Sequence, residues 1–146
     1  MMKFMTNKIL VPVDGSENSE KGLRYACWLA SKIEASITVL HIMTIPYTGE
    51  SAVFHIEPLE AAGRMILERA KKVLKEENCA DAHFVLREGS GNPGHEIVKF
   101  GEEENISLIV MSDKGHSALA HLLMGSVSDM VAKHAPCPIL IVKQKA

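Results

Sequence analysis

The chain alternates between continuous apolar runs and stretches whose apolar residues recur every three or four positions. Continuous runs rich in valine, isoleucine and leucine are typical of strands buried on both faces. They predict five strands, at residues 8–13, 36–43, 82–87, 107–111 and 138–142. Pro12 is expected at the end of the first strand, because proline cannot donate a hydrogen bond to a neighbouring strand.

Between these runs, helical spacing predicts four helices. The first follows Ser16 or Asn18, either of which can cap it. Its apolar stripe consists of Leu23, Ala26, Cys27, Ala30 and Ile33. The second begins at Pro58, a residue suited to a first helical turn. Its stripe consists of Leu59, Ala62, Ile66, Ala70, Val73 and Leu74. Two shorter helices are predicted at 95–104 and 125–135.

Two connecting segments have no sustained period. Residues 44–57 contain Pro46 and Gly49, and we interpret them as a long, mobile surface loop that could cover a ligand. Residues 113–124 carry a small leucine cluster and are expected to form a short helix or a lid.

The alternation of strand and helix predicts an α/β fold. It implies a five-stranded parallel sheet with helices on both faces, a Rossmann-like arrangement. The 146 residues contain no repeat or linker and are 47% hydrophobic, which predicts a single domain over residues 1–146. Ligands of such sheets bind beyond the carboxyl ends of the strands, where the strand order reverses. If the first and fourth strands meet at that point, the loops after Val13 and Met111 converge.

Small residues mark a candidate phosphate site in these loops. Ser112–Gly115 follows the fourth strand, and Gly125–Ser126 opens the last helix, so a phosphate could approach bare backbone N–H groups. Asp14 and Gly15 stand in a similar place after the first strand. Two structural interpretations stay open. Gly125–Ser126 could be only a serine-capped helix start, and Asp14 could be only a turn former.

At the level of motifs the chain resembles the universal stress protein family. The resemblance rests on KILVPVDGS near the start, VLHI, GNPGHEIV and LIVMS, and most specifically on the tail GSVSDMVAKHAPCPILIVK. It implies a five-stranded parallel fold with the last strand at an edge, a homodimer formed through that strand, and a role in stress tolerance and regulation.

One branch of that family binds ATP through the pattern Gly-x2-Gly-x9-Gly-Ser/Thr. Gly115, Gly125 and Ser126 match the pattern, whereas Ser112 replaces its first glycine. The resemblance implies an adenine and ribose pocket lined by residues matching Pro12, Val13, Asp14 and Ile42. It also implies contacts to ribose and phosphates from residues matching Met111, Gly115, Gly125, Ser126 and Val127.

Ser112 leaves two possibilities for this site. Where glycine serves only close approach, serine is the smallest replacement that adds a hydrogen-bonding group. Where the backbone must adopt a positive φ, serine costs of order 1 kcal/mol and weakens binding about tenfold. Asp113 adds a negative charge near the expected phosphates, and Lys114 could offset it. ATP with Mg²⁺, AMP or another anion are all compatible with the pattern, and Glu17 or Asp113 could help to hold the cation.

Other function classes find less support in the sequence. A net charge of −2 gives no argument for nucleic acid or an anionic membrane as partner. The absence of a signal-like or membrane-spanning segment predicts a soluble, cytoplasmic protein. Three cysteines without a CxxC pair are typical of reduced thiols in such a protein. The histidine spacing predicts no metal site.

No motif for efficient catalysis is present. The chain lacks the GxSxG elbow and the P-loop sequence, so we expect at most a weak ATPase. The leading interpretation is a stress-response regulatory protein that binds ATP or a related adenine nucleotide at the ends of the first and fourth strands. The alternative is a nucleotide-independent dimeric interaction module with an unidentified protein partner.

Overall fold

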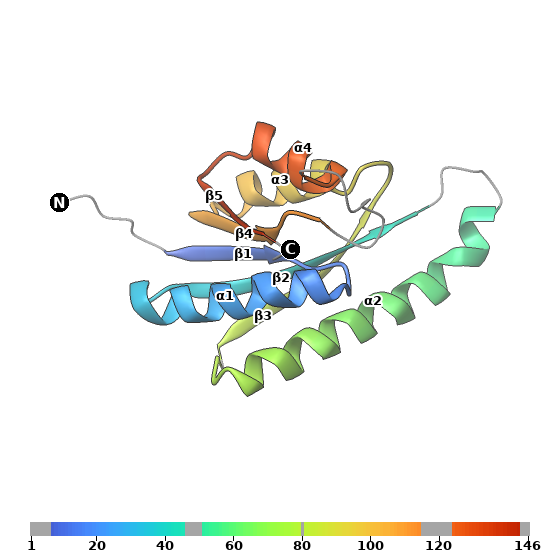
Figure 1. Cartoon of the computed structure of the whole chain (residues 1–146). Coiled ribbons are helices and arrows are strands. Elements are labelled where there is room, and N and C mark those ends of the chain that lie inside the picture. The colour runs from blue at the N-terminus through green and yellow to red at the C-terminus, as the bar shows by residue number, and fades with distance from the viewer. Residues whose placement is uncertain (1–6, 46–50, 80, 115–123, 144–146) are drawn as a thin grey trace.

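A computed structural model describes residues 7–45, 51–79, 81–114 and 124–143. Strands and helices alternate along the chain, as the sequence predicts, and form one twisted sheet between two helical layers (Figure 1). The strands are β1 (Lys8–Pro12), β2 (Ser36–Thr44), β3 (Ala82–Gly89), β4 (Leu108–Ser112) and β5 (Ile139–Val142). The helices are α1 (Glu17–Ile33), α2 (Ser51–Glu76), α3 (Gly94–Glu103) and α4 (Ser126–His134).

All five strands are parallel and follow the order β3-β2-β1-β4-β5. β1 is central, with Ile9 paired to Ile37 of β2 on one side and to Leu108 of β4 on the other. The strand order therefore reverses between β1 and β4, and the predicted neighbourhood of these two strands is confirmed. β5 lies at an edge, also as expected.

The two faces of the sheet carry separate apolar clusters. α1 and α2 cover one face, where residues such as Val11 and Val39 are fully buried. α3 and α4 cover the other, around Leu10, Leu40 and Ile109 (Figure 1). Alternate residues of each central strand serve opposite clusters, which explains why the strands read as continuous apolar runs.

Two residues expected in buried stripes are exposed. Ile33 is 39% exposed because it is the last residue of α1, and the chain turns away at Glu34 in the left-handed conformation (φ 55°). Ala62 of α2 is also exposed, whereas Gly63 beside it is buried against β2 and β3. The predicted helical spacing is correct in both helices. In each helix, however, the buried face is narrower than the stripe of apolar residues.

The predicted surface loop at 44–57 is wrong over most of the described part of that segment. Thr44 closes β2, and α2 already begins at Ser51, with Pro58 in its interior rather than in its first turn. The first turns of α2 extend past the sheet (Figure 1). Proline is usually found in a first helical turn, so the sequence gives no sign that the helix begins before Pro58. Residues 46–50 lie outside the described part.

Candidate functional site

The carboxyl ends of β1 and β4 form the floor of the candidate site. After β1, the Val13 N–H donates to the Leu40 carbonyl of β2 at 2.9 Å. The Asp14 carboxylate then accepts the Ser16 N–H at 2.9 Å, and Gly15 adopts a φ of 86° that favours glycine. Asp14 therefore acts as a turn former, while its predicted contact with a ligand stays a prediction.

Ser112 and Asp113 at the end of β4 are both buried, at 9% and 4% exposure. The Ser112 hydroxyl donates to the Lys114 carbonyl at 3.0 Å. Among the described non-glycine residues, positive φ angles occur only at Glu34, Asn78 and Asn105. Ser112, which replaces the motif glycine, thus has a backbone conformation that any residue can adopt. The strain expected for serine at a positive φ does not occur there.

The start of α4 is attached directly to this strand end. The Asp113 carbonyl accepts two hydrogen bonds, from the Gly125 N–H at 2.6 Å and from the Ser128 hydroxyl at 2.5 Å. A Cβ on Gly125 would lie 3.4 Å from the Asp113 carbonyl oxygen, so glycine permits the close approach. The helix start is thereby fixed beside the end of β4.

Gly125, and not Ser126, is the N-cap of α4, and it makes no side-chain cap bond. The interpretation of Ser126 as the capping serine is therefore wrong, because the helix begins at Ser126 itself, one residue earlier than a serine cap there requires. The Gly125 N–H is also already bonded within the loop. The N–H groups of the first helical residues, Ser126 to Ser128, lack intrahelical acceptors by helix geometry and point toward the N-terminal side.

Asn18 joins α1 to the same loop. Its side-chain amide donates to the Asp113 carboxylate at 3.3 Å and to the Lys114 carbonyl at 3.1 Å. Sequence reasoning considered Asn18 only as a helix cap, a role that Ser16 performs by accepting the Ser19 N–H at 3.1 Å. No local spacing could reveal the contact with Asp113, because it depends on the pairing of β1 with β4.

The remaining predicted site residues divide between the two faces of the sheet. Ile42 and Met111 are buried in the cluster beneath α3 and α4, and Val127 packs against it. Val13 belongs to the opposite cluster, so its side chain does not join theirs. Pro12 is half-buried where β1 ends. Gly115 lies outside the described residues.

Asn92 is a neighbour of the site that sequence reasoning missed. Its side-chain amide donates to the Ser126 carbonyl at 3.3 Å, and its side-chain oxygen accepts the Gly94 N–H at 2.8 Å. The loop before α3 is thereby tied to the start of α4. The conspicuous Gly-Asn-Pro-Gly run was the available signal, although it does not identify α4 as the contact.

The two buried serines of the candidate site have backbone partners. The hydroxyls of Ser112 and Ser128 both donate to backbone carbonyls, so neither has a base as its partner. In the ranges that the structure describes, no group of three His, Cys, Asp or Glu residues could hold a metal ion. Mg²⁺ at this site is therefore an expectation tied to a bound nucleotide.

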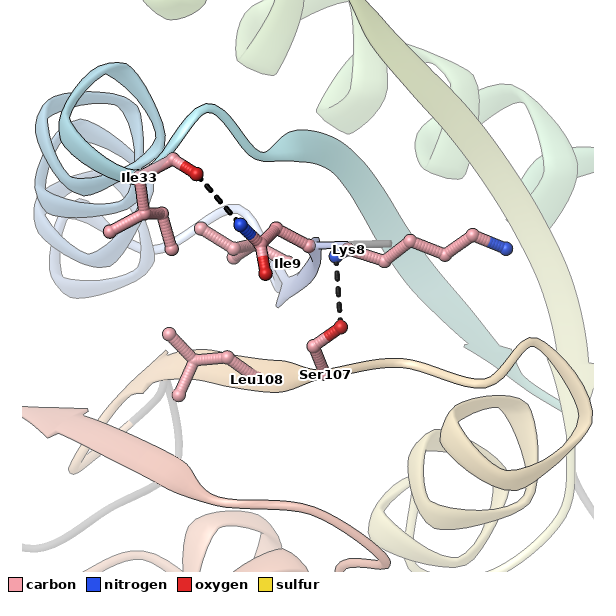
Figure 2. Close-up of a pocket in the computed structure, with 6 residues that line it drawn as sticks. Lys8, Ile9, Ile33, Ser107 and Leu108 are labelled. Atoms are coloured by element: carbon pink, nitrogen blue, oxygen red, sulfur yellow. Dashed lines mark hydrogen bonds between the residues drawn. The ribbon is translucent and has the colours of Figure 1, made fainter. Parts of the chain in front are cut away.

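A separate cavity of about 310 Å³ lies at the opposite edge of the same two strands. Figure 2 shows Ile9, Ile33 and Leu108 around it, with the Lys8 N–H bonded to the Ser107 hydroxyl at 3.0 Å. These residues lie at the amino ends of β1 and β4. This cavity is therefore distinct from the candidate nucleotide site.

Comparison with known proteins gives a consistent assignment. None of the helices within the described residues is long and apolar enough to cross a membrane. A sequence model of the universal stress protein family matches residues 5–143. The universal stress protein YxiE of Bacillus subtilis is 34% identical, over 95% of this chain and 100% of its own length.

Solved structures share the fold. That of MJ0577, a universal stress protein of Methanocaldococcus jannaschii, superposes with a TM-score of 0.79 at 27% identity, covering 97% of this chain and 99% of the other. A universal stress protein from Archaeoglobus fulgidus in complex with dAMP gives a TM-score of 0.68 at 21% identity, covering 94% and 98%. With its five-stranded parallel sheet and a family match over nearly its whole length, the chain belongs to the universal stress protein family.

Proposed function

We propose that this protein binds an adenine nucleotide at the carboxyl ends of β1 and β4 and acts as a stress-response regulator. The phosphates would meet the N–H groups of Ser126 to Ser128 at the start of α4. The base and ribose would lie toward Ile42 and Met111. No catalytic pair is needed for this role, in keeping with the Ser112 and Ser128 hydroxyls, which both donate to backbone carbonyls.

The observation that carries the proposal is the double hydrogen bond from the start of α4 to the Asp113 carbonyl. It fixes a helix N-terminus beside the point where the strand order reverses. Both features favour an anionic ligand, the first through its N–H groups and partial positive charge, the second through its position in the fold.

ATP with Mg²⁺ and AMP make different demands on this site. The buried Asp113 carboxylate adds negative charge close to the phosphate position, which disfavours a triphosphate more than a monophosphate. The dAMP complex of the A. fulgidus relative supports an adenine mononucleotide as one candidate. We expect Mg²⁺ to be required for ATP and to matter little for AMP.

Calorimetric titration of nucleotide-free protein with ATP plus Mg²⁺, ADP and AMP tests the proposal. The informative variant is Ser126→Asp, since a carboxylate at the first helical position favours the helix but repels a phosphate. We expect affinity to fall more than about tenfold, while thermal unfolding is unchanged or shifted upward. Ser31→Asp makes the same change at an exposed residue near the far end of α1 and should bind as wild type.

Two results would count against the proposal. Saturable binding by the wild type that Ser126→Asp leaves unchanged would remove the start of α4 from the site. If no adenine nucleotide binds, by calorimetry and by an independent probe, the protein is not a nucleotide sensor.

A second candidate function is a nucleotide-independent dimeric interaction module. The exposed edge of β5 favours it, because β5 pairs only with β4 in the described sheet. In this case a protein partner should stay bound after nucleotide is removed, and Ser126→Asp should bind it as the wild type does.

A further inference from the structure

Two cysteines that are distant in the sequence lie against each other between α1 and the end of α2. Cys27 is 5% exposed within α1, and Cys79 is half-buried just after α2. Both pack in the apolar cluster on that face of the sheet. The Cys79 side chain is a near neighbour of the Cys27 thiol and, after burial, is the largest influence that raises its pKa.

Neighbouring interactions hold the two thiols in this position. Arg24, one helical turn before Cys27, donates to Glu76 at 2.9 Å and to Glu77 at 2.7 Å. The chain then turns at Asn78 with a φ of 57°, and the Cys79 N–H donates to the Leu74 carbonyl at 2.8 Å. The turn therefore returns Cys79 onto the face of α1 that carries Cys27.

We propose that Cys27 and Cys79 form a reversible intramolecular disulfide when a hydroperoxide oxidises the protein. In the first step one thiol ionises and its thiolate attacks hydrogen peroxide; the O–O bond breaks, and the departing hydroxide takes up the thiol's proton, so that a sulfenic acid and one water result. In the second step the other thiolate attacks the sulfenic sulfur. The S–O bond breaks as the S–S bond forms, and the departing hydroxide takes up a proton to give a second water.

The burial of the two sulfurs sets the order of these steps. Cys79 is the more exposed and is the sulfur that meets peroxide. Burial raises the pKa of the Cys27 thiol well above its usual range, and both Cys79 and Glu77 raise it further, whereas Arg24 opposes them. Cys27 is thus a poor first nucleophile, but it is placed to close the bond once Cys79 is oxidised.

The chain contains its own control in Cys137. This cysteine is also half-buried, and burial likewise raises its pKa. It lies between two prolines before β5, away from the α1–α2 contact that brings the other two cysteines together. Oxidation of Cys137 therefore adds oxygen, whereas oxidation of the pair removes two hydrogens.

The test is treatment of the reduced full-length protein with hydrogen peroxide, followed by intact mass and peptide mapping. Wild type and Cys137→Ser should each form a species about 2 Da lighter with a Cys27–Cys79 linked peptide, reversed by dithiothreitol. Cys27→Ser should instead trap a sulfenic acid on Cys79 that reacts with dimedone. The oxidised wild type should melt about 5 °C or more above the reduced form, because the cross-link closes a long loop.

Two outcomes would overturn the proposal. One is a wild type in which Cys27 and Cys79 only gain oxygen or stay reduced while Cys137 reacts. The other is a disulfide found only between separate chains. Both outcomes are measured on the wild-type protein, so they can be judged even if a serine variant folds poorly.

Discussion

At the scale of single residues, Asp113 dominates the candidate site. Its carbonyl holds the start of α4, its carboxylate accepts a bond from Asn18, and the residue is almost completely buried. The backbone of Asp113 thus fixes the helix start that we propose for the phosphates, while its side chain adds charge of the same sign as such a ligand.

Removing this charge should strengthen nucleotide binding. We expect Asp113→Asn to raise ATP affinity about threefold to tenfold and AMP affinity less, because the repulsion grows with the number of phosphate charges. The amide oxygen can still accept from Asn18, so the loop should keep its shape. Asp81→Asn makes the same change in net charge at an exposed position before β3 and should leave affinity unaltered. Equal affinities for wild type and Asp113→Asn would show that no phosphate lies nearby.

Ser112 can be converted to the glycine of the ATP-binding pattern. Because its backbone φ is not in the left-handed region, Ser112→Gly should change ATP affinity by less than about threefold. The variant should lose about 0.5–1.5 kcal/mol of unfolding free energy, from the lost hydroxyl bond and the freer unfolded chain. Denaturant titration measures this loss, and Ser112→Ala separates its two causes. A tenfold gain in affinity would instead identify the serine as an obstacle.

At the scale of elements, α3 and α4 meet through a glycine. A Cβ on Gly94 would lie 2.6 Å from Met130 Cγ and 2.8 Å from its Cβ, much closer than real Cβ atoms approach. The two helices can therefore lie this close only because residue 94 has no side chain. Their spacing in turn sets the position of the start of α4, where the candidate site lies.

Gly94→Ala should cost about 1–3 kcal/mol of unfolding free energy, because it overpacks this contact. Combining it with Met130→Ala should recover part of the loss relative to the sum of the single variants, as chemical denaturation can measure. Gly101→Ala is the matched control in the same helix. Its Cβ would meet the Pro136 ring at 3.4 Å and Ile109 Cδ1 at 3.8 Å, both ordinary contact distances, so alanine should stabilise the helix there. Destabilisation of the same size at both positions would contradict the packing argument.

Periodicity located the elements well wherever a buried face exists. All five strands and the helices α1, α3 and α4 lie within about two residues of their predicted bounds, since their buried faces appear in the sequence. The start of α2 was missed because its first turns extend past the sheet, and because Pro58 is usually found at a helix start.

The candidate site was less accessible to sequence reasoning. Local motifs indicated the strand ends and the start of α4. The tendency of ligands to bind where the strand order reverses pointed to the same place. The contacts of Asn18 and Asn92 were not, because each joins segments that only the complete fold brings together. Whether serine is strained at position 112 also depends on the backbone φ angle there, which residue spacing in the sequence does not reveal.

At the scale of the whole molecule, β5 leaves one edge of the sheet unpaired in the described structure. The Ile109 N–H donates to the Pro138 carbonyl, and the Asp113 N–H to the Val142 carbonyl. Residues at alternate positions of β5 therefore bond to β4, and the backbone groups of Ile139 and Ile141 point outward. We propose this edge as the contact between two copies in a homodimer.

Ile141→Pro should convert such a dimer to a monomer, because it removes an outward N–H while leaving the bonds to β4 in place. Light scattering after size-exclusion chromatography gives the mass, and circular dichroism confirms that the variant is folded. Ile141→Val retains the N–H and most of the side chain, so it should stay dimeric. A wild type that is monomeric at tens of micromolar, or a proline variant that still dimerises, would exclude this edge as the interface.

The central place of β1 also dictates when the candidate site can exist. The bond between the Lys8 N–H and the Ser107 hydroxyl spans 99 positions of the chain, and such distant pairings form late because closing the intervening loop costs entropy. β1, β2 and β3 can associate while the C-terminal part is still being synthesised. The candidate nucleotide site needs β4 and α4, so it is complete only when both elements have left the ribosome. A ligand bound there would stabilise only chains that already contain both elements, by about 2.7 kcal/mol at a hundredfold excess over its dissociation constant, and would leave shorter nascent chains without that protection.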